Sequence, residues 1–321
     1  MSDLAGNPYA SIVELSKAYR NKSVSPSEVT KAQLARIDDL DTKLGSYQTI
    51  YSDEALAAAK VADEAFTKDS RLGPFHGIPF ALKDIYELKG QITTCGSYEM
   101  RQRISVETGT VVRRLMDVGG IVIGKTKTVE CALGGWGTNE HMGTPWNPWD
   151  LEHPRVPGGS SSGSGVAVAS GLASCATGSD TGGSVRLPAA YCGLTGLKVS
   201  KACLPTDGIM PLSQTLDTPG PMTRNMPDLA LMFSVMKGID GRKIETDMMN
   251  GDGLFNIQMN IFKGLKFGII DQKERSNCTD DILKSYDATL NLLVDLGAEL
   301  EVFTSPIAYD DMARFNGAIT M

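Results

Sequence analysis

Histidine is scarce in this chain, with His76, His141 and His153 the only three among 321 residues. That scarcity limits any mechanism that needs a histidine base. The six cysteines are widely spaced, with no CxxC pair and no histidine at ligand spacing. They therefore predict buried free thiols in a reducing compartment, hence a cytoplasmic protein with no metal site and no cofactor.

Long apolar runs and clusters of basic residues are also missing. No segment approaches the roughly 18 apolar residues that a membrane span needs, and residues 1–10 lack the pattern of a secretory signal. The formal net charge is −7, and the Lys and Arg residues are scattered. Nucleic acid and anionic membranes both favour clustered positive charge, so the sequence predicts no direct nucleic-acid partner and no membrane.

What is present is an alternation of helical and strand patterns. Helices are expected over 11–19, from the Ser25–Glu28 capping box to about residue 40, and over 54–65. Further along, we expect strands at 77–84, 120–124, 265–270 and 299–303, and helices at 110–118, 279–296 and from Ser305-Pro306 to about 318. This alternation favours an α/β fold with a mixed, largely parallel central sheet covered by helices on both faces.

Neither an internal repeat nor a low-complexity linker divides the chain. We therefore expect a single domain over 1–321. It would comprise N-terminal helices at about 9–66, a catalytic core at about 73–240 and further strand-helix units at about 262–321.

Glycine and serine gather in two places, Gly158–Gly165 and Gly178–Ser184. A flexible linker is one interpretation, but small and apolar residues flank both clusters and no polar run separates them. A phosphate-binding loop is another, yet neither G-x-x-x-x-G-K-[ST] nor G-x-G-x-x-G can be read here. We favour a tight turn that exposes a nucleophilic serine, because glycine accepts strained backbone angles and permits close approach of a substrate.

The whole segment from Gly158 to Lys198 resembles the signature stretch of the amidase signature family, which includes the amidase components of amidotransferases. Two outlying matches are Gly77-Ile78-Pro79 with Ala81-Leu82-Lys83-Asp84, and Pro211-Leu212-Ser213 with Leu216-Asp217 and Gly220-Pro221-Met222. The resemblance implies the amidase signature fold and a serine hydrolase of linear, non-peptide carboxamides. It implies too that the chain lacks the C-terminal part of that fold.

Carried over by position, the resemblance assigns a role to each matching residue. Lys83 is implied as the base, Ser160 as the proton relay and Ser184 as the nucleophile that forms an acyl-enzyme. The implied oxyanion hole consists of the N–H groups of Thr181, Gly182, Gly183 and Ser184. The implied supporting residues are Ser161, Asp180 and Arg186, and the peptide bond before Ser160 is implied to be cis.

The chemistry of this triad is coherent in its own right. An alcohol is a poor nucleophile at neutral pH and needs a base, and lysine is a natural substitute where histidine is rare. Lysine acts as a base only when neutral, so burial must lower its pKa from about 10.4. The apolar strand before Lys83 would supply that burial, and strand alternation should turn Asp84 to the opposite face.

Several alternatives stay open at this stage. Cys192 could be a nucleophile, although it has no basic neighbour and a buried structural thiol is favoured. His76 and His141 could touch the pocket, and Trp136, Met142 and Trp146 could line it. The chain could instead be the glutaminase subunit of a glutamyl- or aspartyl-tRNA amidotransferase, with partner subunits, or a truncated, non-catalytic relative. As partners, the sequence predicts a small-molecule amide and leaves a homodimer open, but it does not identify the amide.

Overall fold

The computed structural model of the chain describes residues 4–69, 72–239, 242 and 261–320. The chain separates into two units, Met1–Thr246 and Asp247–Met321. The single domain expected from the sequence stays a prediction.

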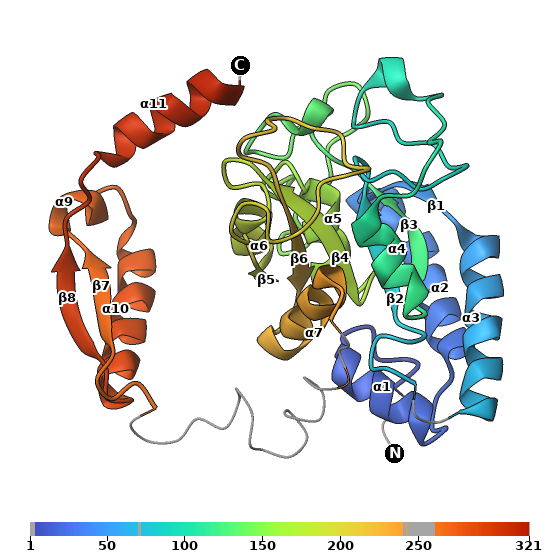
Figure 1. The fold of residues 1–321 in the computed structure, drawn as a ribbon. Helices are drawn as coiled ribbons and strands as arrows, with labels where there is room; N and C mark the ends of the chain where they lie inside the picture. The colour runs from blue at the N-terminus through green and yellow to red at the C-terminus, as the bar shows by residue number, and fades with distance from the viewer. Residues whose placement is uncertain (1–3, 70–71, 240–241, 243–260, 321) are drawn as a thin grey trace. The chain divides into compact units, whose positions relative to one another are not determined.

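The chain enters the first unit through helices, and the one expected from the Ser25–Glu28 capping box starts where that box predicts. Ser11 and Ser25 each accept a hydrogen bond from the backbone of a glutamate three residues later, which completes two capping boxes. The second helix extends beyond the expected residue 40 and stops at Gly45, which adopts the left-handed conformation at φ 59°. These helices are α1 (Ile12–Arg20), α2 (Pro26–Leu44) and α3 (Ser52–Lys68) (Figure 1).

A six-stranded sheet in the order β1-β3-β2-β4-β6-β5 forms the centre of the first unit. The three central strands β3, β2 and β4 are parallel, whereas β1, β6 and β5 join by antiparallel pairing. The strands are β1 (Tyr47–Ile50), β2 (Pro79–Lys83), β3 (Ile121–Thr126), β4 (Cys175–Asp180), β5 (Thr195–Gly196) and β6 (Thr218–Thr223). The predicted mixed α/β sheet is thus confirmed.

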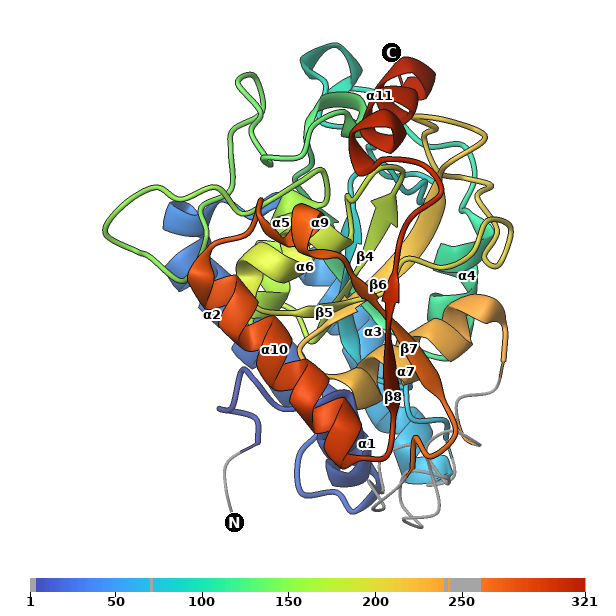
Figure 2. The same cartoon turned by 90° about the vertical axis from the view of Figure 1, so that its left-hand side faces the viewer.

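Helices cover both faces of this sheet, as the alternating pattern predicts. One buried cluster joins α2 and α5 (Ser162–Ala169) to β2, β3 and β4 through Ala81, Ile123 and Ala176. Figure 2 shows α5 and α6 (Arg186–Cys192) on one side of the sheet and α4 (Thr110–Asp117) and α7 (Met226–Lys237) on the other. Short 3-10 turns, η1 (Tyr98–Met100) and η2 (Glu130–Ala132), lie in the connecting loops.

The parallel strands bring the chemical groups to one edge of the sheet. Strand β2 ends at Lys83 and its parallel neighbour β4 ends at Asp180. Carboxyl ends of parallel strands meet at the same edge, which is where ligand sites of α/β folds form. Helix α5 begins there too, directly after Ser160 and Ser161.

The second unit contains a parallel strand pair with a crossover helix. Strands β7 (Lys266–Ile270) and β8 (Glu299–Phe303) pair in parallel, and α10 (Asp280–Asp295) connects them; α9 (Gln272–Arg275) and α11 (Tyr309–Thr320) complete it. The predicted helix start at Ser305-Pro306 is wrong. Ser305 Oγ instead accepts from the Ile307 backbone N–H and donates to the Ile307 carbonyl, a local turn that competes with the helix. None of the described helices is long and apolar enough to cross a membrane.

Candidate active site

Lys83 is completely buried at the end of β2. Its Nζ donates hydrogen bonds to Ser160 Oγ at 2.7 Å and to Ser179 Oγ at 2.9 Å. Burial lowers the pKa of Lys83 to about 7, and the negative charges of Asp180 and Asp217 only partly oppose that effect. The amine is therefore neutral in a large fraction of molecules at neutral pH.

Asp84 follows Lys83 directly but turns to the other side of the strand, as alternation predicts. Its carboxylate accepts from Lys125 Nζ at 3.3 Å and from the backbone N–H and hydroxyl of Thr94 at 3.1 and 2.5 Å. The hydrogen-bond partners of Lys83 Nζ are hydroxyls, and Asp84 is not among them. Lys83 and Asp84 are adjacent in the chain but thus have different hydrogen-bond partners.

Ser160 lies in the loop that precedes α5, and its hydroxyl contacts Lys83 at the carboxyl end of β2. The Gly159–Ser160 peptide bond is cis, as the sequence resemblance implies. The Ser160 carbonyl accepts from Thr128 Oγ1 at 2.8 Å and from the Val129 N–H at 3.3 Å. A Cβ on Gly159 would lie 2.6 Å from the backbone nitrogen of Gly137, so only glycine fits where these loops meet.

Ser184 lies in a turn that Asp180 organises from inside. Asp180 is fully buried and accepts from the backbone N–H groups of Gly183 (2.8 Å), Val185 (3.2 Å) and Arg186 (3.3 Å). The Arg186 guanidinium closes the turn with two further bonds at 3.0 and 2.9 Å. Burial alone would raise the pKa of Asp180, but these donors hold it below its usual range.

Two of the four predicted oxyanion donors have no acceptor among the described residues, namely the N–H groups of Gly182 and Ser184. The Gly183 N–H already donates to Asp180. Gly183 itself has φ 132°, a conformation that side chains rarely adopt. The turn therefore presents amide N–H groups, but Gly183 would have to share its hydrogen.

The two serines of the predicted relay are close neighbours without a bond between their hydroxyls. The Ser161 N–H donates to the Ser184 carbonyl at 3.3 Å, so the two loops touch through their backbones. The described part of the chain has no hydrogen bond between Ser160 Oγ and Ser184 Oγ. The structure thus joins Lys83 to Ser160 and leaves the second link of the relay open.

Ser179 is a polar neighbour of Lys83 that sequence reasoning missed. It lies on β4, next to β2 in the sheet, and its backbone is held by Ser161, whose Oγ donates to the Ser179 carbonyl at 3.4 Å and accepts from its N–H at 3.3 Å. This contact makes Ser161 a support for Ser179. The pairing of β2 with β4 is the signal that would have identified Ser179, and a single sequence does not reveal it.

The alternative nucleophile Cys192 and the histidine His76 each have contacts of their own. Cys192 is buried, its Sγ donates to the Pro157 carbonyl at 3.5 Å, and burial raises the pKa of the thiol to about 12. A protonated buried thiol is inert. His76 contacts the Val118 carbonyl and the Phe66 ring, and burial lowers its pKa.

A cavity of about 420 Å³ opens beside Ser179 and Thr181. Its wall is largely the loop from Thr206 to Leu212 together with Asp217, Thr218 and Pro219. None of Trp136, Met142 and Trp146 lines it. Trp146 instead packs against the core beside α2 and α5, and Trp136 is 64% exposed.

This combination of sheet, serine–glycine turn and buried lysine agrees with what sequence comparison finds. A model of the amidase family, described as Amidase, matches residues 28–318. The chain belongs to the amidase family.

The curated relatives of this chain include amidotransferase subunits. The chain is 37% identical over 308 residues to a glutamyl-tRNA(Gln) amidotransferase subunit from Prochlorococcus marinus, and the match covers 95% of this chain and 62% of the relative. It is 36% identical to the subunit of the same name from Geobacter metallireducens, covering 92% and 60%. The chain therefore spans about three fifths of the length of these relatives.

Solved structures of amidases share the fold. The native peptide amidase of Stenotrophomonas maltophilia superposes with a TM-score of 0.80 at 30% identity, covering 96% of this chain and 64% of that one. The corresponding glutamyl-tRNA(Gln) amidotransferase subunit from Thermotoga maritima gives a TM-score of 0.70 at 26% identity, covering 92% and 67%. Both solved proteins are longer than this chain.

Proposed function

We propose that this chain carries the catalytic centre of an amidase that hydrolyses the C–N bond of a linear, non-peptide carboxamide. The observation that carries the proposal is the 2.7 Å hydrogen bond between the buried Lys83 amine and Ser160. An amine whose pKa lies near 7 can accept a proton from a hydroxyl, and it needs no histidine to do so.

In the proposed reaction, neutral Lys83 takes the hydroxyl proton of Ser160, which takes that of Ser184. Ser184 Oγ then attacks the substrate carbonyl, and the oxyanion is stabilised by N–H groups of Thr181 to Ser184. Each such donor is typically worth about 3–4 kcal/mol. When the C–N bond breaks, the proton returns along the relay to the leaving nitrogen, and water then hydrolyses the acyl-enzyme by the same path.

The open link between Ser160 and Ser184 does not oppose this mechanism. Catalytic hydrogen bonds are often long in the free enzyme and tighten when substrate binds. Rotation about the Cα–Cβ bond of Ser184 is the movement we propose for closing the relay. Asp180 and Arg186 keep the backbone of this turn fixed while the hydroxyl moves.

A second candidate is the glutaminase subunit of a glutamyl- or aspartyl-tRNA amidotransferase. The names of the relatives from Prochlorococcus and Geobacter support it, whereas the peptide amidase of Stenotrophomonas supports a stand-alone enzyme. Under the second candidate the chain would require the other amidotransferase subunits; under the first, a homodimer or a single chain would suffice. The six free cysteines support placing either form in the cytoplasm.

We also propose that both units belong to one amidase domain. The family match runs from residue 28 to 318 and so includes parts of both. The 420 Å³ cavity would then receive a small amide. In the longer relatives, the additional residues would contribute further walls to the corresponding cavity.

Ammonia release from aliphatic, aromatic and urea-derived amides and from glutamine tests the proposal, with and without the other amidotransferase subunits. Labelling by a fluorophosphonate, which forms an ester with an activated serine, serves as a substrate-independent measure. We expect labelling to require Ser184 and Lys83. Labelling of Ser184→Ala at the wild-type rate would contradict the proposal, and absence of labelling in the wild type would favour a non-catalytic chain.

A further inference from the structure

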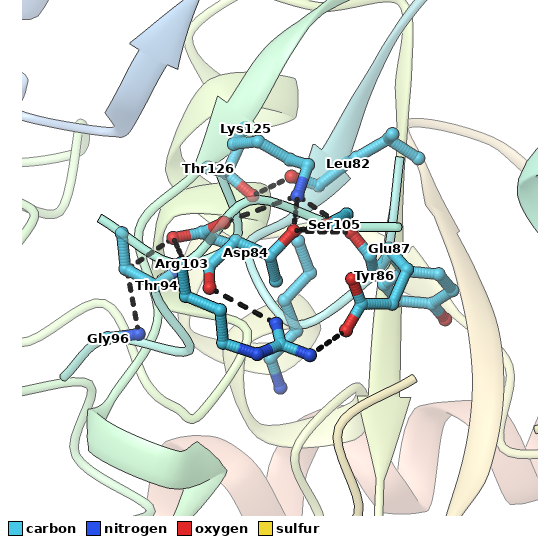
Figure 3. Close-up of polar contacts among 12 residues, drawn as sticks. Leu82, Asp84, Tyr86, Glu87, Thr94, Gly96, Arg103, Ser105, Lys125 and Thr126 are labelled. Carbon is cyan, nitrogen blue, oxygen red and sulfur yellow. Dashed lines mark hydrogen bonds and ion pairs between the residues drawn. The ribbon is translucent and has the colours of Figure 1, made fainter. Parts of the chain in front are cut away.

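Next to the proposed base lies a second buried lysine that the mechanism does not use. Lys125 sits on β3, where it pairs with Leu82, the residue before Lys83. It is fully buried, and its Nζ donates to Tyr86 O at 2.6 Å, Thr93 Oγ1 at 2.8 Å and Asp84 Oδ1 at 3.3 Å. Figure 3 shows the Lys125 amine beside Asp84 and Tyr86.

These contacts fit a charged lysine. An ammonium has three donors and no acceptor, and Lys125 finds three acceptors, one of them a carboxylate. Within the described part of the chain, the partners of Lys83 Nζ are two hydroxyls, which can bond a neutral amine equally well. The two lysines thus differ in their partners rather than in their burial.

We infer that Lys125 is a positioning residue, which holds the charge of Asp84 on the far side of β2 so that Lys83 has no carboxylate partner. The inference rests on the proposed role of Lys83 as a base. Without Lys125, Asp84 would be an uncompensated negative charge buried one residue from that base, and it would favour the charged form of Lys83.

The network also leads to Ser160. Thr94, bonded to Asp84, accepts from the Gly96 N–H at 3.1 Å. Asn139 Nδ2 then joins the carbonyls of Gly96 and Thr128 at 2.7 and 3.0 Å, and Thr128 Oγ1 donates to the Ser160 carbonyl. The Lys125–Asp84 pair therefore anchors the loops that hold the relay serine.

Other titratable groups near the two lysines have partners of their own or remain protonated. Around Lys83, Asp180 is paired with Arg186, and Asp217 accepts from Thr181 Oγ1 at 2.5 Å and from the Leu212 N–H at 2.9 Å. Burial raises the pKa of Cys95 to about 12, so the thiol stays neutral. Near Lys125, Glu87 forms an ion pair with Arg103 (Figure 3). Asp84 is thus the acid whose charge depends on Lys125.

The test is the pH dependence of fluorophosphonate labelling in four proteins. The acid limb of this profile is the pH range in which the labelling rate rises as Lys83 loses its proton. Loss of the cation in Lys125→Met should shift the midpoint of this limb upward by about one pH unit. Loss of the anion in Asp84→Asn should shift it downward, because Lys125 would then be an uncompensated positive charge buried near Lys83. The double variant Asp84→Asn/Lys125→Met should return the limb to the wild-type position.

Shifts of opposite sign in Lys125→Met and Asp84→Asn distinguish the inference from a purely structural role of the pair. In a purely structural role, both variants would lower the labelling rate without moving the acid limb in opposite directions. If Lys125→Met does not fold, Asp84→Asn and the double variant still decide the matter. Unmoved limbs in the folded variants would overturn the inference. Undiminished labelling of Lys83→Met would instead reject the proposed base, so the two failures are distinguishable.

Discussion

Lys83 and Lys125 lie on neighbouring strands, where Lys125 pairs with Leu82, the residue before Lys83. Both lysines are completely buried. Lys83 meets the hydroxyls of Ser160 and Ser179, whereas Lys125 meets a carboxylate, a carbonyl and a hydroxyl. Desolvation favours the neutral amine at both sites, and only Lys125 has a bonded anion to oppose it. Burial alone therefore does not make a lysine a base; its bonded partners decide.

The sharpest way to break the comparison is to remove each amine in turn. For Lys83→Met we expect labelling of Ser184 to fall by about 10³-fold or more, because a general base is worth 10²–10⁴. Its free energy of unfolding should fall by no more than about 2 kcal/mol, since the loss of hydrogen bonds to hydroxyls is opposed by removal of an amine that must lose its proton on folding. Labelling rates and urea unfolding measure the two quantities. A loss of less than tenfold would contradict the role of Lys83.

The matching change at the other lysine should act on stability first. Lys125→Met leaves the buried carboxylate of Asp84 unpaired, which typically costs about 3–5 kcal/mol. Replacement of both partners in Asp84→Leu/Lys125→Met should recover most of that loss. Urea unfolding of the two variants measures the difference. Equal stabilities for the single and double variants would show that the pair is not coupled.

The pH dependence of stability sharpens the comparison further. Burial lowers the pKa of Lys83 from 10.5 to about 7, so between those values the unfolded chain binds more protons than the native protein. Stability should therefore rise with pH through this window. Urea unfolding at pH 7 and pH 9.5 should show a smaller rise in Lys83→Met than in the wild type. Equal rises would mean that Lys83 titrates normally.

Smaller effects are expected from the hydroxyls around Lys83. Ser179→Ala removes one of its two hydrogen bonds, worth about 1 kcal/mol, and should lower the labelling rate roughly fivefold. Ser162→Ala is a matched control, because among the described residues Ser162 Oγ bonds to the Lys127 carbonyl alone, at 3.4 Å. If Ser162→Ala lowers the labelling rate as much as Ser179→Ala does, the hydrogen bond from Lys83 to Ser179 has no specific effect on labelling.

The smallest effect should come from Cys192→Ala. The thiol packs in the core with a raised pKa, so we expect the labelling rate to stay within about threefold of the wild type. Rate measurement at saturating probe is sufficient. A loss comparable with that of Ser184→Ala would restore Cys192 as a candidate nucleophile.

Local patterns predict much of this molecule. The capping box at Ser25 gave the correct helix start, because the cap is a contact between residues three apart. Strand alternation correctly separated Asp84 from Lys83. The turn around Ser184 was likewise evident as a cluster of glycine and serine.

Contacts across the sheet could not be predicted in the same way. The bonds of Lys83 to Ser179 and of Lys125 to Asp84 depend on which strands are neighbours and in what register. A single sequence does not determine that pairing. The start of α11 was missed for a local reason, since the Ser305 hydroxyl binds its own backbone neighbourhood.

The protonation state of Lys83 can be measured directly. Lysines labelled with 13C at Cε can be titrated by NMR, with the Lys83 signal assigned by its loss in Lys83→Met. We expect a midpoint near pH 7. A midpoint near the ordinary lysine value of about 10.4 would contradict the proposed mechanism, because the base would then be charged whenever the enzyme works.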